Sequence, residues 1–250
     1  MKAVILAAGV GSRLAPLTND RPKALVPVLG KPILFRHLES LARAGIADRD
    51  VVVVGGYKLD VLRDALAKDH PDVTVVENDR FEPWNNFWSL YVAEAAVKGQ
   101  DFLQIDGDAL LDDVILPRMM SAPGEALLAV DCRDELDDET MKVELRGGKR
   151  DHGAQVAAVS KKLAAADCVG EYIGVTKLTA AAAEQVFREL EVLRDLGLTH
   201  EYYEHAYHRL TGRDQVRFGI VDVHDCTVTE IDNVADLARA EELLRALEAR

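Results

Sequence analysis

The chain has 250 residues, of which 48% are apolar and 29% charged, and its formal net charge is −13 at pH 7. This length allows one large α/β domain or two small ones, and the acidic balance argues against a nucleic-acid partner, which normally needs a basic surface. No apolar run approaches the roughly 20 residues of a membrane span, and glycines and Arg13 interrupt the apolar start of the chain, so we expect a cytoplasmic protein without a membrane partner.

Short β-branched runs alternate with helical stretches in the first half of the chain. Strands are predicted at residues 3–6, 51–54, 73–76 and 102–105, and helices at 32–44, 59–68 and 87–97. The four valines at 51–54 are typical of a strand that is buried on both faces. The alternating β-α-β-α order predicts a parallel sheet with right-handed crossovers.

The second half has more strands in succession. They are predicted at residues 127–130, 141–145, 155–159, 172–177, 216–221 and 226–228, with helices at 180–194, 200–211 and 233–249. We therefore expect a Rossmann-like α/β fold with a mixed, mostly parallel central sheet flanked by helices. The chain would form a single domain over residues 1–250, with a nucleotide-binding half at 1–125. A smaller substrate-facing lobe at 126–250 would bind the acceptor and carry the closing helix.

The most informative segment is LAAGVGSRLAPLTNDRPKAL, residues 6–25. Its small residues let backbone N–H groups approach a phosphate closely, and Arg13 and Lys23 add two positive charges. A Walker A loop is excluded because Ser12 and Arg13 stand where it needs Lys and Ser or Thr. The dinucleotide fingerprint is excluded because Leu14 replaces its third glycine. A strand–helix turn with incidental basic residues stays as the structural alternative.

The order of glycine, arginine, proline and lysine in this segment resembles the signature LAAGxGxRLxPLTxxxPKxL of nucleotidyltransferases of the sugar-nucleotide type. Those enzymes activate a phosphorylated compound with an NTP, and their fold is the nucleotide-diphospho-sugar transferase fold. The resemblance implies that Arg13 and Lys23 are catalytic, with Lys23 stabilising charge on the α-phosphate. It also implies a group of nucleotide-binding residues in the loop: Leu6, Ala7, Ala8, Gly9, Gly11 and Ser12.

Carboxylates at the end of a predicted buried strand point to a metal. Asp106 and Asp108 form a DxD motif after residues 102–105, at the edge of a parallel sheet where ligands bind. Their hard oxygen atoms suit Mg²⁺, although a turn-forming Asp-Gly-Asp sequence is the alternative. The segment TEIDN at 229–233 resembles the E-I-D segment before the final helix of cytidylyltransferases. That resemblance makes Asp108 and Asp232 the metal ligands and leaves Asp106 among the nucleotide-binding candidates; helix capping by Asp232 is compatible with this role.

The segments 77–81 and 85–90, ENDRF and NNFWSL, bear on the choice of nucleotide. They resemble the bacterial branch of CTP:phosphocholine cytidylyltransferases, in which this helix start lies beside the pyrimidine. The resemblance implies that CTP is the nucleotide and that Asn86 and Ser89 contact cytosine. Helix capping by the asparagines is the structural alternative.

The acceptor is indicated by a departure from that branch. Where the phosphocholine enzymes carry a tryptophan after an acidic loop, this chain reads DETMKV at 138–143, which with GEYIG at 170–174 resembles the cytidylyltransferases of phosphonate metabolism. The resemblance implies 2-aminoethylphosphonate or 2-hydroxyethylphosphonate as acceptor. Phosphocholine, a sugar or inositol phosphate, and a non-catalytic nucleotide-sensing domain remain alternatives, and a homodimer is common in such families. The candidate acceptor-binding residues are Lys142, Lys161, Glu171, Tyr172, Tyr202 and Tyr203, although surface lysines and core aromatics are the ordinary interpretation of such residues.

Overall fold

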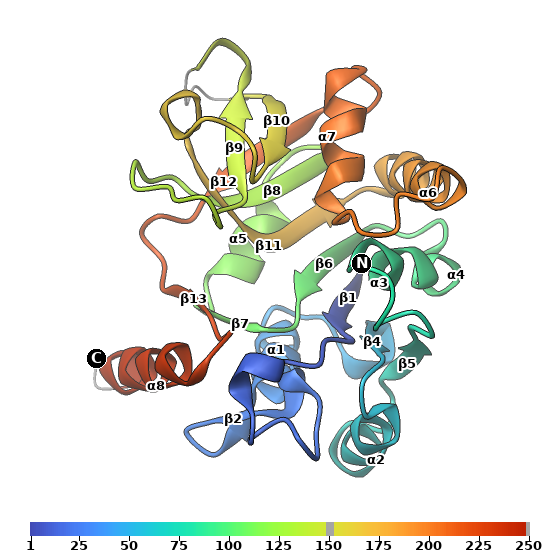
Figure 1. The fold of residues 1–250 in the computed structure, drawn as a ribbon, viewed down its shortest axis with the longest axis vertical. Helices are drawn as coiled ribbons and strands as arrows, with labels where there is room; N and C mark the ends of the chain where they lie inside the picture. Colours follow the sequence, from blue (N-terminus) through green and yellow to red (C-terminus); the bar gives the residue numbers. More distant parts are fainter. Residues whose placement is uncertain (149–152, 249–250) are drawn as a thin grey trace.

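The computed structural model describes residues 1–148 and 153–248 (Figure 1). Its centre is a set of parallel strands, as the alternating pattern predicts. Strand β1 (Lys2–Ala7) lies between β4 (Val51–Gly55) and β6 (Phe102–Asp106), and β5 (Thr74–Glu77) pairs with β4. Leu6 is in register with Val54 and with Asp106, so the end of β1 lies directly beside the predicted carboxylate motif.

The second half of the chain extends this sheet through the nine-residue strand β11 (Gly170–Leu178), which runs antiparallel to β6. β11 also pairs with β8 (Ala126–Asp131) and β9 (Lys142–Leu145). Beyond them, β12 (Phe218–Asp222) pairs with β8, and β10 (Val156–Ser160) pairs with β9. The expected mixed sheet is therefore confirmed, and the change of strand direction at β11 separates its two halves.

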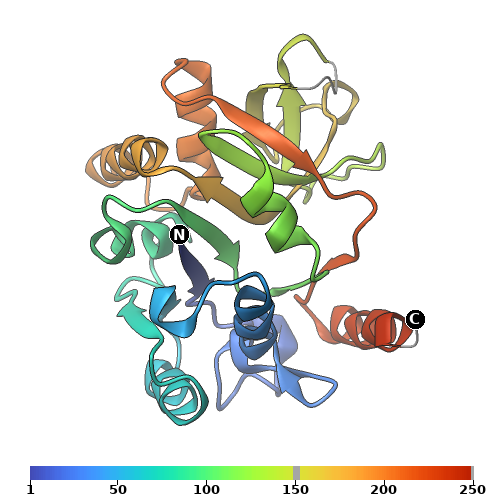
Figure 2. The same cartoon turned by 180° about the vertical axis from the view of Figure 1, so that it is seen from behind.

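Helices cover both faces of the sheet, as Figures 1 and 2 show from opposite sides. Val4 of β1 packs into the core formed with α3 (Phe87–Val92), α6 (Ala180–Asp195) and α7 (Glu204–Gly212). Ala3 and Ile5 point to the other face and pack with α1 (Ile33–Arg43), α2 (Leu59–Asp69) and α5 (Ile115–Ser121). This alternation follows from the two-residue period of a strand.

A third core cluster attaches the C-terminal helix α8 (Val234–Glu248) to the N-terminal loop. Leu14, Leu110, Ile231 and Leu244 are among its buried side chains. Two short ladders frame it: β7 (Ala109–Leu111) pairs with β13 (Val228–Glu230), and β2 (Pro27–Val28) pairs with β3 (Lys31–Pro32). The helices in the described ranges are all too short or too polar to cross a bilayer.

Several boundaries differ from the sequence predictions, mostly where a segment is short. The helix expected at 87–97 is interrupted at Ala93 into α3 and α4 (Glu94–Val97), and α7 begins at Glu204 rather than at residue 200. The last strand runs from Val228 to Glu230 instead of 226–228. Strands β2, β3 and β7 and helix α5 were not predicted, because two to seven residues carry too little periodicity. The predicted end of the closing helix, residue 249, lies outside the described residues.

Candidate active site

The glycine-rich loop follows β1 and packs against Lys23. Gly11 has a φ of +66°, and a Cβ atom there would lie 2.8 Å from the Cβ of Lys23. Thr18 Oγ1 donates a hydrogen bond of 3.0 Å to the carbonyl oxygen of Gly11. Lys23 itself opens a short 3₁₀ turn, Lys23–Leu25, directly after Pro22. Glycine at position 11 is therefore what allows the lysine to approach the loop.

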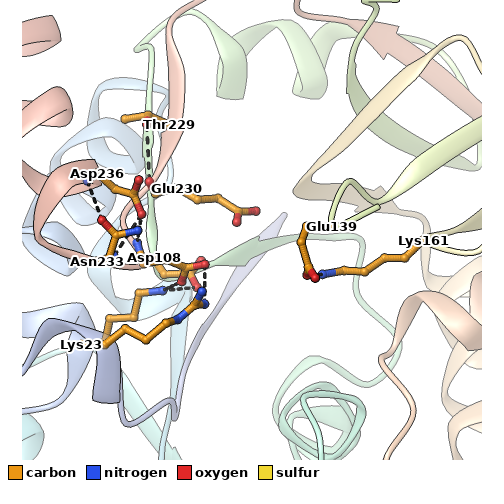
Figure 3. Close-up of polar contacts among 10 residues, drawn as sticks. Lys23, Asp108, Glu139, Lys161, Thr229, Glu230, Asn233 and Asp236 are labelled. Atoms are coloured by element: carbon orange, nitrogen blue, oxygen red, sulfur yellow. Dashed lines mark hydrogen bonds and ion pairs between the residues drawn. The ribbon is translucent and has the colours of Figure 1, made fainter. Parts of the chain in front are cut away.

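Lys23 brings together the two carboxylates that the sequence assigns to the metal. Its Nζ lies 2.9 Å from Asp108 Oδ2 and 2.5 Å from Asp232 Oδ1, while Arg13 contacts the other oxygen of Asp232 at 2.8 Å (Figure 3). The lysine side chain is 9% exposed, against 38% for Asp108 and 31% for Asp232. Burial alone would lower the pKa of Lys23, but the two carboxylates raise it above its ordinary value. The ammonium is thus held charged between them.

The positions of these carboxylates follow from the β7–β13 ladder. Asp108 lies in the turn between β6 and β7, and its carbonyl oxygen accepts a hydrogen bond of 2.9 Å from the amide of Ile231. The next residue, Asp232, has its own amide bonded at 3.0 Å to the carboxylate of Asp236 at the start of α8. Because Ile231 is fully buried in the third core cluster, the backbone on both sides of the site is fixed.

A third carboxylate, Glu230, lies beside this pair and extends toward the second lobe in Figure 3. Its side chain is open to solvent. Partial enclosure by protein and the negative charges of Asp108 and Asp232 nevertheless raise the pKa of Glu230 to about 7. The site therefore has more negative than positive charge close to Lys23.

These residues match the chemistry of a hard divalent cation. Asp108 and Asp232 present half-buried carboxylate oxygens on one side of Lys23, and Mg²⁺ typically takes one or two carboxylates together with substrate phosphate oxygens. Among residues 1–148 and 153–248, no group of three or more His, Cys, Asp or Glu side chains has the arrangement of an all-protein metal centre. The donor set accordingly suits a cation shared with a phosphate ligand.

Asp106 lies deeper than Asp108 and belongs to a buried polar network. Tyr203 donates to its Oδ2 at 2.8 Å and Gln104 to its Oδ1 at 2.9 Å, while the hydroxyls of Tyr203 and Tyr172 are 3.1 Å apart. Burial raises the pKa of Asp106 well above its ordinary value, and the charges of Glu204 and Asp108 raise it further. Tyr172 and Tyr203, predicted to line the acceptor's tail, are thus core residues beneath the site.

Gln104 and Glu204 were not singled out from the sequence, although Gln104 carried a signal. It is the single polar side chain within the apolar strand before Asp106, two residues away and therefore on the same face. Glu204 carried none that we recognise, since its proximity to Asp106 depends on how α7 packs.

Asn86 and Ser89, the predicted cytosine contacts, lie at the start of α3 and are already hydrogen-bonded within the protein. Asn86 Oδ1 accepts from the amide of Tyr203 at 3.1 Å. Ser89 is buried, and its Oγ accepts from Asn78 Nδ2 at 2.9 Å. Asn78 was not assigned a role from the sequence. Both residues tie α3 to neighbouring loops, and their contact with a base stays a prediction.

The predicted acceptor residues separate into two groups. Lys161 is partly exposed: it contacts Glu139 Oε2 at 3.3 Å and lies 5.4 Å from the ring centre of Tyr202, opposite Glu230 in Figure 3. Lys142 is buried instead, and its Nζ donates to the carbonyl of Lys161 at 2.7 Å. Lys142 therefore supports the segment that carries Lys161.

Glu171 lines a small cavity beside the cluster of Asp108, Asp232 and Glu230. The cavity measures about 180 Å³, and Glu230 and Arg239 also border it. Glu171 pairs with Arg133. Burial outweighs this pairing and raises the pKa of Glu171.

The sequence of the chain is similar to that of known nucleotidyltransferases. The family model described as "Nucleotidyl transferase" matches residues 2–126. The chain is similar to choline-phosphate cytidylyltransferase of Streptococcus pneumoniae (38% identity over 109 residues, 42% of this chain and 44% of the relative). It is also similar to 2-aminoethylphosphonate cytidylyltransferase of Lancefieldella rimae (37% over 112 residues, 44% of each). These two matches span less than half of either relative.

Longer matches cover nearly the whole chain. CTP:phosphoglutamine cytidylyltransferase of Campylobacter jejuni is 29% identical over 225 residues, which is 83% of this chain and 85% of that relative. The solved structure of CTP:phosphocholine cytidylyltransferase from S. pneumoniae has a TM-score of 0.76 at 26% identity and covers 97% of this chain and 98% of its own. The nucleotide-diphospho-sugar transferase-like fold expected from the sequence is therefore confirmed.

Proposed function

Because this chain belongs to the nucleotidyl transferase family, in its cytidylyltransferase branch, we propose that it transfers CMP from CTP to a small phosphorylated or phosphonylated acceptor. The observation that carries the proposal is the position of Lys23, which contacts Asp108 and Asp232 and packs against Gly11. A lysine, a pair of carboxylates and a loop rich in backbone N–H groups together suit a triphosphate.

In this reaction the chain positions the reactants and supplies positive charge. The triphosphate lies over the loop at residues 9–13, and Lys23 stabilises the charge that develops on the α-phosphate. Arg13, whose side chain is 69% exposed, reaches the outer phosphates. Asp108 and Asp232 are the residues that would hold Mg²⁺, whose positive charge offsets that of the phosphates.

The transfer itself needs no general base from the protein. An oxygen of the acceptor forms the new bond to the α-phosphorus, the bond from that phosphorus to the bridging oxygen breaks, and pyrophosphate leaves. A phosphate or phosphonate dianion already has the electron pair that this attack requires. The proposed step thus depends on charge and alignment rather than on a proton acceptor.

For the acceptor we propose a phosphonate, 2-aminoethylphosphonate or 2-hydroxyethylphosphonate. Lys161 and Tyr202 are the predicted acceptor residues whose side chains are partly exposed to solvent, and Lys161 offers a positive charge for the anionic group. Burial tends to lower the pKa of Lys161, but Tyr202 and Glu139 raise it, so the ammonium stays charged. In this proposal residues 1–125 bind the nucleotide and residues 126–250 bind the acceptor.

Release of pyrophosphate by the purified protein with Mg²⁺ tests both parts of the proposal. The four NTPs would each be combined with 2-aminoethylphosphonate, 2-hydroxyethylphosphonate, phosphocholine, phosphoglutamine, inositol phosphate and glucose 1-phosphate. We expect release with CTP and a phosphonate. Release with CTP and phosphocholine or phosphoglutamine would contradict the acceptor while supporting the nucleotide, and release only with another NTP would contradict both.

The variant Asp108→Asn distinguishes a loss of activity from a loss of folding. It removes one carboxylate charge at nearly constant shape, so we expect an unchanged circular dichroism spectrum and turnover reduced by about 10²-fold or more. Undiminished turnover would sink the assignment of Asp108. Asp113→Asn changes an exposed carboxylate just after β7, so it is the matched control and should retain activity.

A further inference from the structure

The loop that joins α6 to α7, residues 196–203, contacts both halves of the chain (Figure 1). Its hydrogen bonds to the first half go to Asn85 and Asn86, directly before α3. Near its end, the ring centre of Tyr202 lies 5.4 Å from the Nζ atom of Lys161. The loop therefore connects the region predicted to contact cytosine with the region predicted to bind the acceptor.

The two asparagines hold the backbone of this loop at three points. The amide of Asn85 donates to the carbonyl oxygen of Thr199 at 2.9 Å, and its side-chain Nδ2 donates to that of His200 at 2.9 Å. Asn86 Oδ1 accepts from the amide of Tyr203 at 3.1 Å. The side-chain oxygen of Asn85 also accepts from the amide of Asn86 at 2.7 Å. The side chain of Asn85 thus joins the start of α3 to the loop.

Tyr203 connects the same asparagine to the carboxylate strand. Its amide bonds Asn86, and its hydroxyl donates to Asp106 at 2.8 Å, at the end of β6. A single residue therefore bridges the start of α3 and the carboxyl end of β6. Ligands of parallel α/β sheets bind at this edge, so the asparagines lie beside the region where the nucleotide is expected.

The position of Tyr202 depends on the backbone of the loop. Its side chain is 39% exposed, whereas the neighbouring Tyr203 is fully buried. Packing in the core therefore fixes Tyr203 but leaves Tyr202 only partly restrained. The contact between Tyr202 and Lys161 is then maintained by the loop backbone, which Asn85 holds at Thr199 and His200.

We propose that Asn85 is a positioning residue for the acceptor and couples acceptor binding to nucleotide binding. This inference rests on the proposed function. Nucleotide bound beside Asn86 restrains the start of α3 and, through Asn85, the loop that places Tyr202 beside Lys161. The acceptor then binds with a smaller loss of conformational entropy. By linkage, each substrate raises the affinity for the other by the same factor.

The variant Asn85→Asp breaks the contact with the loop and keeps the local one. An aspartate still accepts from the amide of Asn86, but it has no N–H for the carbonyl of His200. Because this contact is exposed, we expect a melting temperature close to that of the wild type. The KM for the acceptor should rise about 3–10-fold, as for the loss of one hydrogen bond, while kcat and the KM for CTP change less than about twofold. Gln100→Glu makes the same change of amide to carboxylate at an exposed position before β6 and should change none of these constants.

Calorimetry measures the coupling without turnover. 2-Aminoethylphosphonate, or phosphocholine if pyrophosphate release selects it, would be titrated with Mg²⁺ into the full chain. The titrations would be made with and without a CTP analogue that has a methylene bridge between its α- and β-phosphorus atoms. We expect the analogue to raise the affinity of the wild type for the acceptor about tenfold, and that of Asn85→Asp by less than about threefold.

The contrary outcomes are distinct. If the analogue binds the wild type but does not change its affinity for the acceptor, the inference fails and the proposed function stands. If the analogue does not bind the wild type, both fail. Equal increases in the KM for CTP and for the acceptor in Asn85→Asp would show a general disturbance of the site and would also overturn the inference. Should this variant be unfolded, Asn85→Ala removes the same contact without adding a charge, and the same criteria apply.

Discussion

Replacing Lys23 by methionine removes the ammonium that lies between two carboxylates while keeping an unbranched side chain of similar length. Each contact, at 2.9 and 2.5 Å, corresponds to about 6 kcal/mol of Coulomb attraction at an effective dielectric constant of roughly 20. Most of this attraction is offset by the desolvation of the lysine and by solvent around the carboxylates, which are about one-third exposed. We expect the variant to lose about 1–3 kcal/mol of unfolding free energy without Mg²⁺, below the full loss of a buried pair.

Mg²⁺ should restore much of this stability. In the variant, Asp108 loses its neutralising partner and Asp232 keeps only the exposed Arg13, so a divalent cation that binds only the folded state gains affinity. Thermal unfolding with and without Mg²⁺ measures the effect, and a loss of this size corresponds to roughly 2–12 °C for a chain of this length. Turnover with CTP should fall by about 10²–10³-fold even with Mg²⁺, because the charge on the α-phosphate loses its stabiliser.

Two results would refute this reasoning. If Lys23→Met unfolds at the wild-type temperature without Mg²⁺, the carboxylates do not depend on the lysine for charge balance. If turnover persists at the wild-type level, the lysine has no part in the reaction. Lys68→Met, at an exposed site on α2, is the control for a general effect of losing a positive charge.

Three further predictions concern the loop, the buried network and pH. Gly11→Ala should cost at least about 1 kcal/mol of stability, because the residue has a φ of +66° and its Cβ would meet a side chain at 2.8 Å. Gly9→Ala, with nothing within 4 Å of its Cβ, should keep its stability but raise KM for CTP. Tyr203→Phe should cost about 1–3 kcal/mol, because it leaves Oδ2 of Asp106 without its donor. Burial raises the pKa of Glu204 from its ordinary value of 4.5 to about 7, so the folded state retains a proton there that the unfolded state releases. Wild-type stability should therefore fall as the pH rises from 4.5 to about 7. Glu204→Gln should weaken this pH dependence, so its stability relative to the wild type should be higher above pH 7 than below it.

Each of these predictions has a control and a contrary outcome. Equal melting temperatures for the two glycine variants would contradict the role of backbone conformation at the loop. Tyr91→Phe, whose hydroxyl accepts from Arg194 at the surface, should lose less stability than Tyr203→Phe. Glu82→Gln, at an exposed position, should leave the pH dependence of unfolding unchanged. If Glu204→Gln and Glu82→Gln change the pH dependence of unfolding equally, the buried carboxyl of Glu204 is not the origin of that dependence.

The candidate site could be predicted because its residues lie in short contiguous motifs that each end a strand or begin a helix. Arg13, Lys23, Asp108 and Asp232 meet in the structure as the motifs imply. Parallel strands bring their carboxyl ends to one edge, so β1 and β6 deliver the loop and the carboxylate together regardless of the rest of the fold. At this site the local sequence pattern determines which side chains meet.

The side-chain burial in the second half of the chain could not be predicted to the same degree, because it depends on contacts between distant segments. Lys142 begins a strand whose alternation gives no reason to bury a lysine, yet the segment around Lys161 covers it and accepts its hydrogen bond. Tyr203 precedes a helix by one residue and lies in the core because α7 packs over β10 and beside α6. A sequence pattern identifies such residues as aromatic or charged but not which neighbour covers them.

The local charges of the site explain how a chain with a net charge of −13 could bind an anionic nucleotide. Arg13 and Lys23 contribute two positive charges, which Asp108 and Asp232 already balance, and Glu230 adds a further carboxylate. A triphosphate brought to this cluster meets no excess of positive charge from the protein alone. In the proposed reaction, a cation that arrives with the nucleotide would restore the charge balance, and the two aspartates would bind that cation rather than the phosphates. The same carboxylates that would repel free CTP thus favour its metal complex.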